Sequence, residues 1–491
     1  MPIPNHLSTP PRKAYTQIWR SLGVIAAAVL ATAGCNVDSG VLSAAGSGTF
    51  DLTASIAADE PRAAVVGRDV LAAGGTAADA AVAMGLAMAV TLPARAGLGG
   101  GGICLVHDPD QQPARQDVRA LDFLPRGPAG SGAAVPGTPR GLYALHAAYG
   151  RLRWERLVAP VEGLARMDRS VSRAAALDFA DFEPLIAGDA EARRIFMASG
   201  PTPDEGQPLA QLDLAGTLGQ IRQHGVGALH TGPLAERIAR ASGIPVDALR
   251  AYRPAWTGTD TAPVGNAALH FAAADGRSAA GGWQAGVGED GDRAARVLEA
   301  LRPASAEAPP TAGLAVLDGE GQAVACAFSM GGPFGTREMV PGTGIFLARP
   351  TGAAGIGGPV LLVNPNTRNV LFGAAGSTGL PEEGPAGAEA GLVTAMVALL
   401  DREAAPADAV AAMRIAPAPG PSPGEAGADG VVLVERGAPA SIGASLQRPV
   451  AVVPTIGRVN LFHCTVDRTD GRRDCRAQTD PRGFGLALMG Y

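Results

Sequence analysis

The segment from Thr76 to Val90, which reads TAADAAVAMGLAMAV, constrains the fold of this 491-residue chain more than any other. Thr76 followed by Asp79 predicts the start of a helix, and Pro93 predicts its end. The helix is apolar on nearly every face, so other parts of the chain must cover it on all sides. Its small side chains, and the glycines at 99–102 that follow, allow close backbone packing. The sequence therefore predicts a buried helix in a wide, layered core.

The order of the remaining predicted elements indicates the fold class. Further helices are predicted at 61–71, 140–149, 154–167, 212–224, 233–242, 292–301 and 388–401. Strands are predicted at 103–106, 267–274, 313–317, 323–328, 360–363, 370–373, 431–435, 451–453 and 459–462. Because 47% of the residues are hydrophobic, a chain of this length can bury a large core. We therefore predict a layered α+β fold in which the two ends of the chain come together.

Residues 309–335 contain a second informative pattern. Two short runs rich in Val, Ala and Leu are separated by Asp-Gly-Glu-Gly, which predicts a tight β-hairpin. Thr311 stands in front of the first strand, behind a segment rich in proline and alanine. In that place a self-cleaving precursor would expose an amino-terminal nucleophile, whose own α-amine can act as the base. Most threonines before a strand only cap or edge it, so the hypothesis needs support from the rest of the chain.

The first residues of the chain have the pattern of an export signal. Arg12, Lys13 and Arg20 form a basic start, and 22–33 form an apolar core that is too short to span a bilayer as a stable helix. We therefore predict a signal peptide at 1–34 and an exported protein.

The end of this signal, Thr-Ala-Gly-Cys at 32–35, resembles a bacterial lipoprotein box. Cys35 is therefore a predicted lipidation site, and 35–50 form a predicted tether. Acyl chains would then hold the protein at a membrane surface, in the periplasm or at the outer membrane, without a transmembrane helix. Cleavage nearby by an ordinary signal peptidase is the alternative.

The charged residues exclude several kinds of function. A net charge of −6 offers no basic face for nucleic acid, so no nucleic-acid partner is expected. Lys13 is the only lysine of the chain, and it lies in the predicted signal peptide. Schiff-base chemistry, a Walker-type phosphate loop and a Ser-x-x-Lys acylase all require a lysine, so the mature chain excludes them.

The five cysteines predict one disulfide. Cys464 and Cys475 flank a turn, and a hairpin centred there would place them opposite each other. An oxidising compartment favours that bond. Cys104 and Cys326 lie in apolar runs and are expected to be inert core residues. The histidines are dispersed without metal-ligand spacing, so we predict no metal site and no cofactor.

Beyond residue 60, most of the chain resembles the gamma-glutamyltransferases (glutathione hydrolases). The landmarks occur in the family's order: GGTAADAAVA (74–83), VPGTPRGL (135–142), YGRLRWERLVAP (149–160), QLDLAGTL (211–218), VDALRAYR (246–253), PFGT (333–336), PGTGI (341–345) and DPRGFG (480–485). The resemblance implies an amino-terminal-nucleophile hydrolase fold, a four-layered αββα sandwich. It also implies self-cleavage into a large region, 51–310, and a small region, 311–491, which would form a heterodimer.

The resemblance also implies a set of catalytic residues. Thr311 falls where the family has its nucleophilic threonine, and Ser329 falls where a second hydroxyl residue hydrogen-bonds that threonine. Gly376 and Ser377 correspond to the glycine pair whose backbone amides hold the oxyanion. Thr311 would attack an amide carbonyl of a small substrate, and water or an amine would then release the acyl group.

The chain departs from the family where the glutamyl group would bind. The family's carboxylate-binding arginine belongs directly after Asp122-Phe123, whereas Arg126 is displaced from that position by two residues. The family's amino-group ligands are replaced by a segment that contains Arg349. Arg126 and Arg349 are candidates for a rebuilt carboxylate site, and surface charge is the plainer interpretation. Pro310 is also unfavourable, because its ring limits how its carbonyl can meet the Thr311 hydroxyl.

Two hypotheses of function follow, and a third is rejected. The first is an exported amidase or acyltransferase that acts on a gamma-glutamyl or related acyl group. The second is a catalytically degenerate lipoprotein that serves as a binding or scaffold module. The third reads 327–331 as the nucleophile elbow of an α/β-hydrolase, which requires a helix directly after Ser329. Gly331-Gly332-Pro333 prevents that helix.

Overall fold

The computed structural model describes residues 54–110, 118–167, 169–272, 276–288, 293–301, 309–352, 356–379, 383–384, 386–418, 430–439, 441–466 and 473–490. The predicted signal peptide and tether, with Cys35, lie outside these residues. No helix in the described part of the chain is both long enough and apolar enough to cross a membrane.

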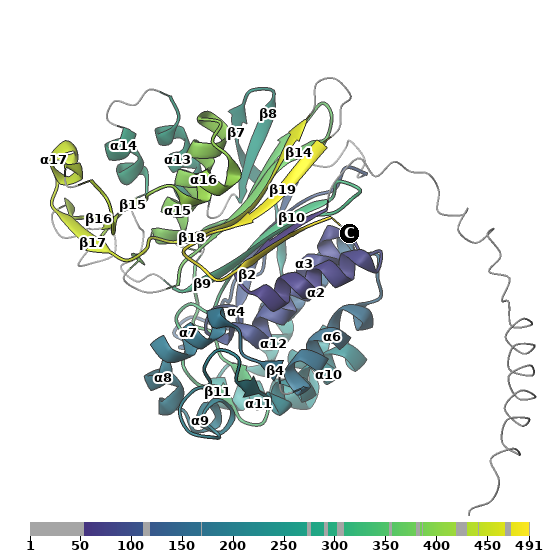
Figure 1. The fold of residues 1–491 in the computed structure, drawn as a ribbon. Coiled ribbons are helices and arrows are strands. Elements are labelled where there is room, and N and C mark those ends of the chain that lie inside the picture. The colour runs from purple at the N-terminus through teal and green to yellow at the C-terminus, as the bar shows by residue number, and fades with distance from the viewer. Residues whose placement is uncertain are drawn as a thin grey trace, which may run out of the picture. The chain divides into compact units, whose positions relative to one another are not determined.

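Two antiparallel sheets form the centre of the fold (Figure 1). The first sheet has the strand order β20-β1-β9-β10-β2-β3-β6, and the second has the order β19-β18-β14-β13-β8-β7. The strands of the first sheet are β1 (Ser55–Ala58), β2 (Gly101–His107), β3 (Val118–Asp122), β6 (Ala255–Thr257), β9 (Thr311–Leu317), β10 (Ala323–Ser329) and β20 (Leu486–Met489). Those of the second are β7 (Thr259–Val264), β8 (Ala267–Ala272), β13 (Val360–Asn364), β14 (Asn369–Ser377), β18 (Arg458–Val466) and β19 (Arg473–Thr479). Because β1 pairs with both β9 and β20, the start of the described chain lies beside its end, as predicted.

The two sheets stack face to face through an apolar layer. On β9, Ala315 and Leu317 belong to the layer between the sheets, whereas Leu314 and Val316 belong to the core beneath the helices. This alternation follows from the two-residue period of a strand. Since both faces of β9 are covered, every residue of its sequence TAGLAVL is buried.

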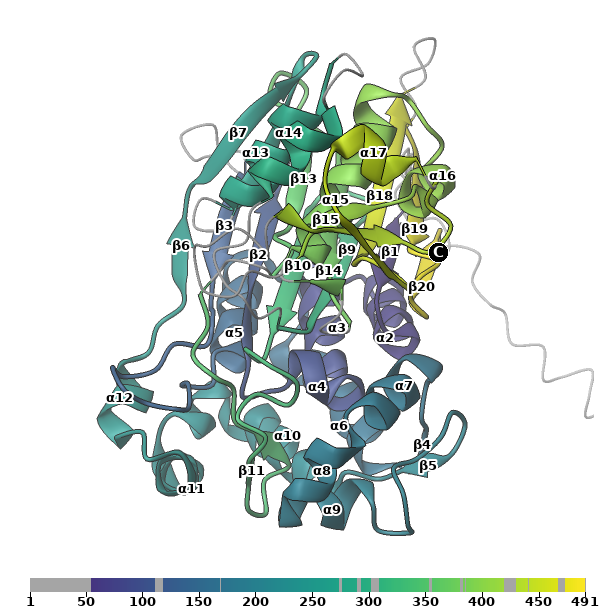
Figure 2. The same cartoon turned by 90° about the vertical axis from the view of Figure 1, so that its left-hand side faces the viewer.

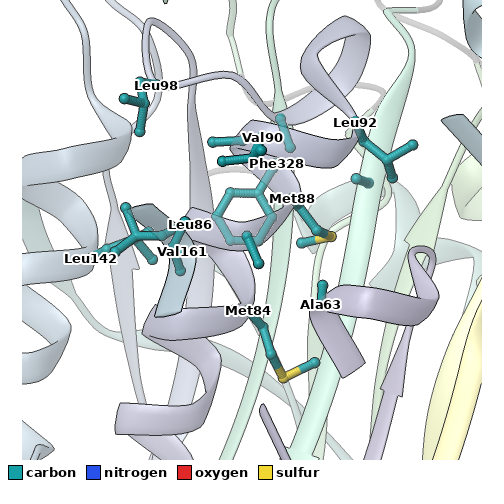
Figure 3. Packing of buried hydrophobic residues seen from close by; sticks show 14 of the residues in the cluster. Ala63, Met84, Leu86, Met88, Val90, Leu92, Leu98, Leu142, Val161 and Phe328 are labelled. Atoms are coloured by element: carbon teal, nitrogen blue, oxygen red, sulfur yellow. The ribbon is translucent and has the colours of Figure 1, made fainter. Parts of the chain in front are cut away.

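Two helices, α2 (Pro61–Ala72) and α3 (Ala77–Thr91), cover the outer face of the first sheet. Thr76 and Asp79 form a reciprocal capping box at the start of α3, and every residue of α3 is buried, as the sequence predicts. Figure 3 shows the ring of Phe328 from β10 close to Leu86 of α3. A Cβ atom on Gly85 would lie 2.9 Å from that ring, so the close packing requires glycine.

Two other helices, α13 (Gly276–Gly286) and α15 (Gly387–Met396), cover the outer face of the second sheet. The backbone of α15 approaches β14 so closely that a Cβ on Gly376 would lie 2.5 Å from Ala388 O. Helices on both outer faces of two stacked sheets make four layers. The predicted αββα sandwich is therefore confirmed.

The other elements are peripheral to the four layers. Figures 1 and 2 show the helices between β3 and β6 gathered at one end of the sheets, near α4. The helices between β3 and β6 are α5 (Thr138–Tyr149), α6 (Trp154–Arg166), α7 (Arg173–Asp181), α8 (Glu183–Gly188), α9 (Ala190–Phe196), α10 (Leu212–His224), η1 (Val226–Leu229), α11 (Gly232–Ser242) and α12 (Val246–Ala251), whereas α4 (Pro93–Ala96) precedes β2. The smaller elements are β4 (Arg169–Ser170), β5 (Pro208–Leu209), α14 (Arg293–Ala300), β11 (Met339–Val340), β12 (Ile345–Phe346), η3 (Val397–Asp401), α16 (Pro406–Ala411), β15 (Ile415–Pro417), β16 (Val432–Glu435), α17 (Ile442–Leu446) and β17 (Val450–Val453).

Two disulfides join neighbouring strands. Cys464 and Cys475 lie opposite each other on β18 and β19 and are bonded to each other. Cys104 and Cys326 lie opposite each other on β2 and β10, with a Cα–Cα distance of 4.1 Å, and are also bonded. Cys104 and Cys326 are core residues, as expected, but the expectation that they are chemically inert is wrong because they form a disulfide. Their 222-residue separation conceals a strand register that only the folded sheet creates.

Candidate active site

Thr311 is the first residue of β9 and is completely buried. Gly313, two residues further on, faces β14 of the second sheet, where a Cβ on it would lie 3.2 Å from the Ala375 Cβ. Because alternate residues of a strand share a face, the Thr311 side chain points toward the end of β14. The predicted hairpin thus carries Thr311 into the space between the two sheets.

The Thr311 hydroxyl meets Thr378, the residue directly after β14. Thr378 N donates a hydrogen bond to Thr311 Oγ1 at 2.8 Å, and the two hydroxyl oxygens are 3.3 Å apart. Thr311 N donates to Thr378 O at 3.0 Å. Thr378 Oγ1 donates to Pro309 O at 2.9 Å. A single residue at the end of β14 therefore binds the chain on both sides of the Pro310–Thr311 bond.

Two buried side chains fix the start of β9 from behind. Gly313 N donates to Asp59 Oδ2 at 2.7 Å, and Asn460 Nδ2 donates to Asp59 Oδ1 at 2.8 Å. Asn460 Nδ2 also donates to Gly313 O at 3.2 Å. Asp59 follows β1 and Asn460 lies on β18, so residues from the two ends of the chain hold this strand in place.

Ser329 lies directly opposite Thr311 in the pairing of β9 with β10. Residues opposite each other in such a pair project from the same face of a sheet, so Ser329 is the cross-strand neighbour of Thr311. The Ser329 Oγ accepts a hydrogen bond from Gly331 N at 3.0 Å. The structure thus brings Thr311 and Ser329 together, while the Thr311 hydroxyl bonds to Thr378.

Gly376 and Ser377 end strand β14, directly before Thr378. Gly376 N donates to Gly357 O at 3.0 Å, so this amide is already bonded to the backbone. Ser377 is completely buried, and its Oγ has no hydrogen-bond partner among the described residues. The amide that reaches the Thr311 oxygen belongs to Thr378, one residue beyond the predicted pair. The short run Gly-Ser-Thr-Gly at the end of an apolar strand is the sequence signal that could have indicated it.

A buried ion pair lies beside Thr378. The guanidinium of Arg95 donates to both carboxylate oxygens of Asp178, and its Nη1 lies 3.5 Å from Thr378 O. Burial opposes the charge of Arg95, but the neighbouring Asp178 carboxylate outweighs this, so the pKa of Arg95 is raised. On the other side, Gly379 N donates to the buried carboxylate of Glu383 at 2.8 Å. The Thr378 segment is thus held between two charged groups that the sequence patterns did not reveal.

The two arginines expected to bind substrate lie in adjacent segments, because Thr351 N donates to Pro125 O at 3.0 Å. Arg126 is occupied: its guanidinium binds both carboxylate oxygens of Asp122, at 2.9 and 2.5 Å. Arg349 N donates to Met330 O at 3.0 Å, next to Ser329. Among the described residues, the half-buried Arg349 guanidinium has no hydrogen-bond or ion-pair partner. Arg349 is therefore the better candidate for binding an anion.

No group of three or more His, Cys, Asp or Glu side chains within the described ranges is arranged to hold a metal ion. The chemistry available at the site is that of hydroxyls, backbone amides and the arginines around them.

Comparisons with known proteins identify relatives of part of the chain. Residues 63–258 match the model of the Gamma-glutamyltranspeptidase family. The glutathione hydrolase proenzyme of Bacillus subtilis (strain 168) is 31% identical over 203 residues, which cover 38% of this chain and 34% of the relative. The Escherichia coli (strain K12) proenzyme is 30% identical over 208 residues, covering 38% and 35%. The matched segment thus spans about a third of the length of each of these relatives.

Among solved structures, the cephalosporin acylase from Bacillus halodurans is similar over 89% of this chain and 95% of its own, with a TM-score of 0.72 and 20% sequence identity. That likeness shows the fold. Residues 63–258 are thus similar to the gamma-glutamyltranspeptidase family, and the described chain has the four-layered αββα fold of the cephalosporin acylase.

Proposed function

We propose that this chain is an amidohydrolase or acyltransferase whose nucleophile is Thr311, exposed when the chain cuts itself after Pro310. The observation that carries the proposal is the bond from Thr378 N to Thr311 Oγ1 at 2.8 Å, deep between the sheets. A buried hydroxyl at a strand start, with a backbone amide directed at it, is suited to nucleophilic acyl transfer.

Self-cleavage would proceed by attack of Thr311 Oγ1 on the carbonyl carbon of Pro310. The new C–O bond forms, the Pro310–Thr311 C–N bond breaks, and the hydroxyl proton ends on the Thr311 nitrogen. Water then hydrolyses the resulting ester. The products are a carboxylate at Pro310 and a free α-amine at Thr311.

In turnover, the α-amine of Thr311 would accept the proton of its own hydroxyl while Oγ1 attacks the substrate amide. An acyl ester forms on Thr311, and the leaving amine takes the proton. Water or a second amine then releases the acyl group. Removing one oxyanion donor from such a site costs about 3 kcal/mol, so the amides around Gly376, Ser377 and Thr378 matter greatly. Gly376 N would have to give up its bond to Gly357 O to take part.

For the substrate, we favour a gamma-glutamyl or related acyl group that bears a carboxylate. The Arg349 backbone is bonded to Met330, its guanidinium lies next to Gly332, and this half-buried side chain has no anionic partner in the described part of the chain. An arginine can bind a carboxylate through two parallel hydrogen bonds. The residues that bind the substrate's amino group in the family are absent here, so a free amino group on the acyl chain should add little binding affinity.

Replacing Arg349 with methionine should lower kcat/KM for glutaryl anilide about tenfold or more, because a hydrogen-bonded charge contributes about 1.5–3 kcal/mol. Butyryl anilide, which has no carboxylate, should be hydrolysed as before. Arg126→Gln is the matched variant, since Arg126 is already bound to Asp122, and it should change kcat/KM less than threefold. The rate of aniline release measures kcat/KM for the wild type and both variants on each substrate. Equal losses in both variants, or on both substrates, would remove Arg349 from the acyl site.

The alternative is a catalytically degenerate scaffold or binding module. The replaced glutamyl ligands and the rigid Pro310 favour it. It predicts that the purified wild-type chain releases no aniline from gamma-glutamyl, glutaryl or butyryl anilide, whereas the enzyme proposal predicts release from at least one.

We also infer that the protein is exported and anchored by lipid at Cys35. The disulfides Cys104–Cys326 and Cys464–Cys475 pair the other four cysteines, and such bonds persist in oxidising compartments.

The Cys35→Ser variant should move from the membrane pellet to the soluble fraction of the cell envelope, because it lacks the acylated side chain. Immunoblotting of fractionated cells measures this, with Cys104→Ser as a control that also replaces one cysteine with serine. Unchanged sedimentation of the Cys35→Ser variant would exclude the anchor.

A further inference from the structure

Thr378 contacts the predicted cleavage site through more groups than any residue named from the sequence. Its N–H binds Thr311 Oγ1, its carbonyl accepts from Thr311 N, and its hydroxyl donates to Pro309 O. It directly follows β14 of the second sheet, and it is 1% exposed. These contacts hold the chain both before and after the Pro310–Thr311 peptide bond.

The hydrogen bonds also fix the direction of the Thr311 hydroxyl. The carbonyl oxygen of Pro309 can only accept, so the single hydroxyl hydrogen of Thr378 is used there. Across the 3.3 Å contact between the two hydroxyls, Thr378 Oγ1 is then the acceptor and Thr311 is the donor. The amide of Thr378 takes one lone pair of Thr311 Oγ1. The other lone pair is free to attack.

We propose that Thr378 is the positioning residue for self-cleavage. Its hydroxyl draws the Thr311 proton away from the scissile carbonyl, and its bond to Pro309 O holds the segment before the cut. Its carbonyl holds the Thr311 nitrogen, which receives the proton when the C–N bond breaks. This role rests on the proposed function, because it exists only if the chain cuts itself.

The bond from Thr378 Oγ1 to Pro309 O belongs to the uncut chain. After cleavage, residues 309 and 310 form the end of a separate fragment, and the Thr378 hydroxyl is released for other partners. The Thr378 amide does not depend on the side chain and stays next to the nucleophile. Loss of the hydroxyl should therefore slow cleavage more than it slows turnover by chains that are already cut.

The test is pulse-labelling of the full chain in expressing cells, followed by the rate at which the small fragment forms on a denaturing gel. Thr378→Val keeps the shape of the side chain but lacks the hydroxyl, and it should slow cleavage about tenfold or more. Thr378→Ser keeps the hydroxyl and should cleave within about threefold of the wild-type rate. Thr217→Val is the matched control. Thr217 lies on helix α10, and its buried hydroxyl also donates to a backbone carbonyl, Thr343 O, at 2.8 Å. It should cleave at the wild-type rate.

The outcomes separate this role from the proposed function. Wild-type cleavage in Thr378→Val overturns the positioning role alone, and so does a Thr378→Ser chain as slow as Thr378→Val. Slow cleavage in Thr217→Val as well would mean that any lost buried hydroxyl has this effect, which also overturns it. An uncut wild-type chain overturns self-cleavage itself, and the positioning role with it.

Discussion

Replacing Thr311 with alanine is expected to leave the chain in one piece and to lower amide hydrolysis at least about a thousandfold. Alanine lacks the Oγ1 atom that would attack the Pro310 carbonyl, so the peptide bond survives and no α-amine is freed at residue 311. Without that hydroxyl, no acyl ester can form on a substrate either. A denaturing gel measures the first effect, and aniline release measures the second.

Thr311→Ser is the matched variant, because it keeps the hydroxyl and removes only a methyl group. It should still yield two fragments. The prediction is wrong if the alanine variant yields the same fragments as the wild type, because another residue or a host protease would then make the cut. It is also wrong if the uncut alanine variant keeps wild-type activity.

The two fragments are expected to stay covalently joined after cleavage. Cys104 on β2 precedes Thr311, and Cys326 on β10 follows it, so their disulfide crosses the predicted cut. Without reductant, the cut protein should migrate on a denaturing gel as one species. With reductant, it should separate completely into a large and a small fragment.

The second disulfide provides the matched control. Cys464 and Cys475 both follow the cut, so Cys475→Ala should leave the fragments joined, whereas Cys326→Ala should release the small fragment without reductant. A specific protease site inserted at 302–308 tests the tether even in a chain that does not cut itself. Fragments of the wild type that separate without reductant would contradict this prediction.

Local patterns predicted the parts of the fold that depend on residues close in sequence. The capping box at Thr76, the apolar helix α3 and the β9–β10 hairpin each follow from a few neighbouring residues. The Cys464–Cys475 pair falls in the same class, because the two residues flank a single turn. In each case the interaction joins residues that are close in the sequence, so the sequence pattern alone predicts it.

The features that local patterns did not predict depend on which strands, distant in sequence, become neighbours in the fold. Nothing near Cys104 indicates that β2 pairs with β10 in the register that opposes Cys326. Thr378 was overlooked for a similar reason, because its importance comes from the stacking of one sheet on the other. The ion pair between Arg126 and Asp122 depends on the direction in which the Arg126 side chain points after the end of β3. The spacing of the charged residues in the sequence does not determine that direction.

The helices α7 to α9, between 173 and 196, also lay outside the sequence prediction. They are short, with six to nine residues each, and most of their stability must come from packing against the rest of the protein. Asp178 of α7 shows why they matter, because it holds Arg95 beside Thr378.

The central claim is that the chain cuts itself at one peptide bond, and amino-terminal sequencing of the small fragment tests it most directly. The purified wild-type protein should give a reduced fragment that begins Thr311-Ala312-Gly313, and Thr311→Ala should give none. A wild-type chain that stays whole, or a fragment that begins at any other residue, would contradict the account.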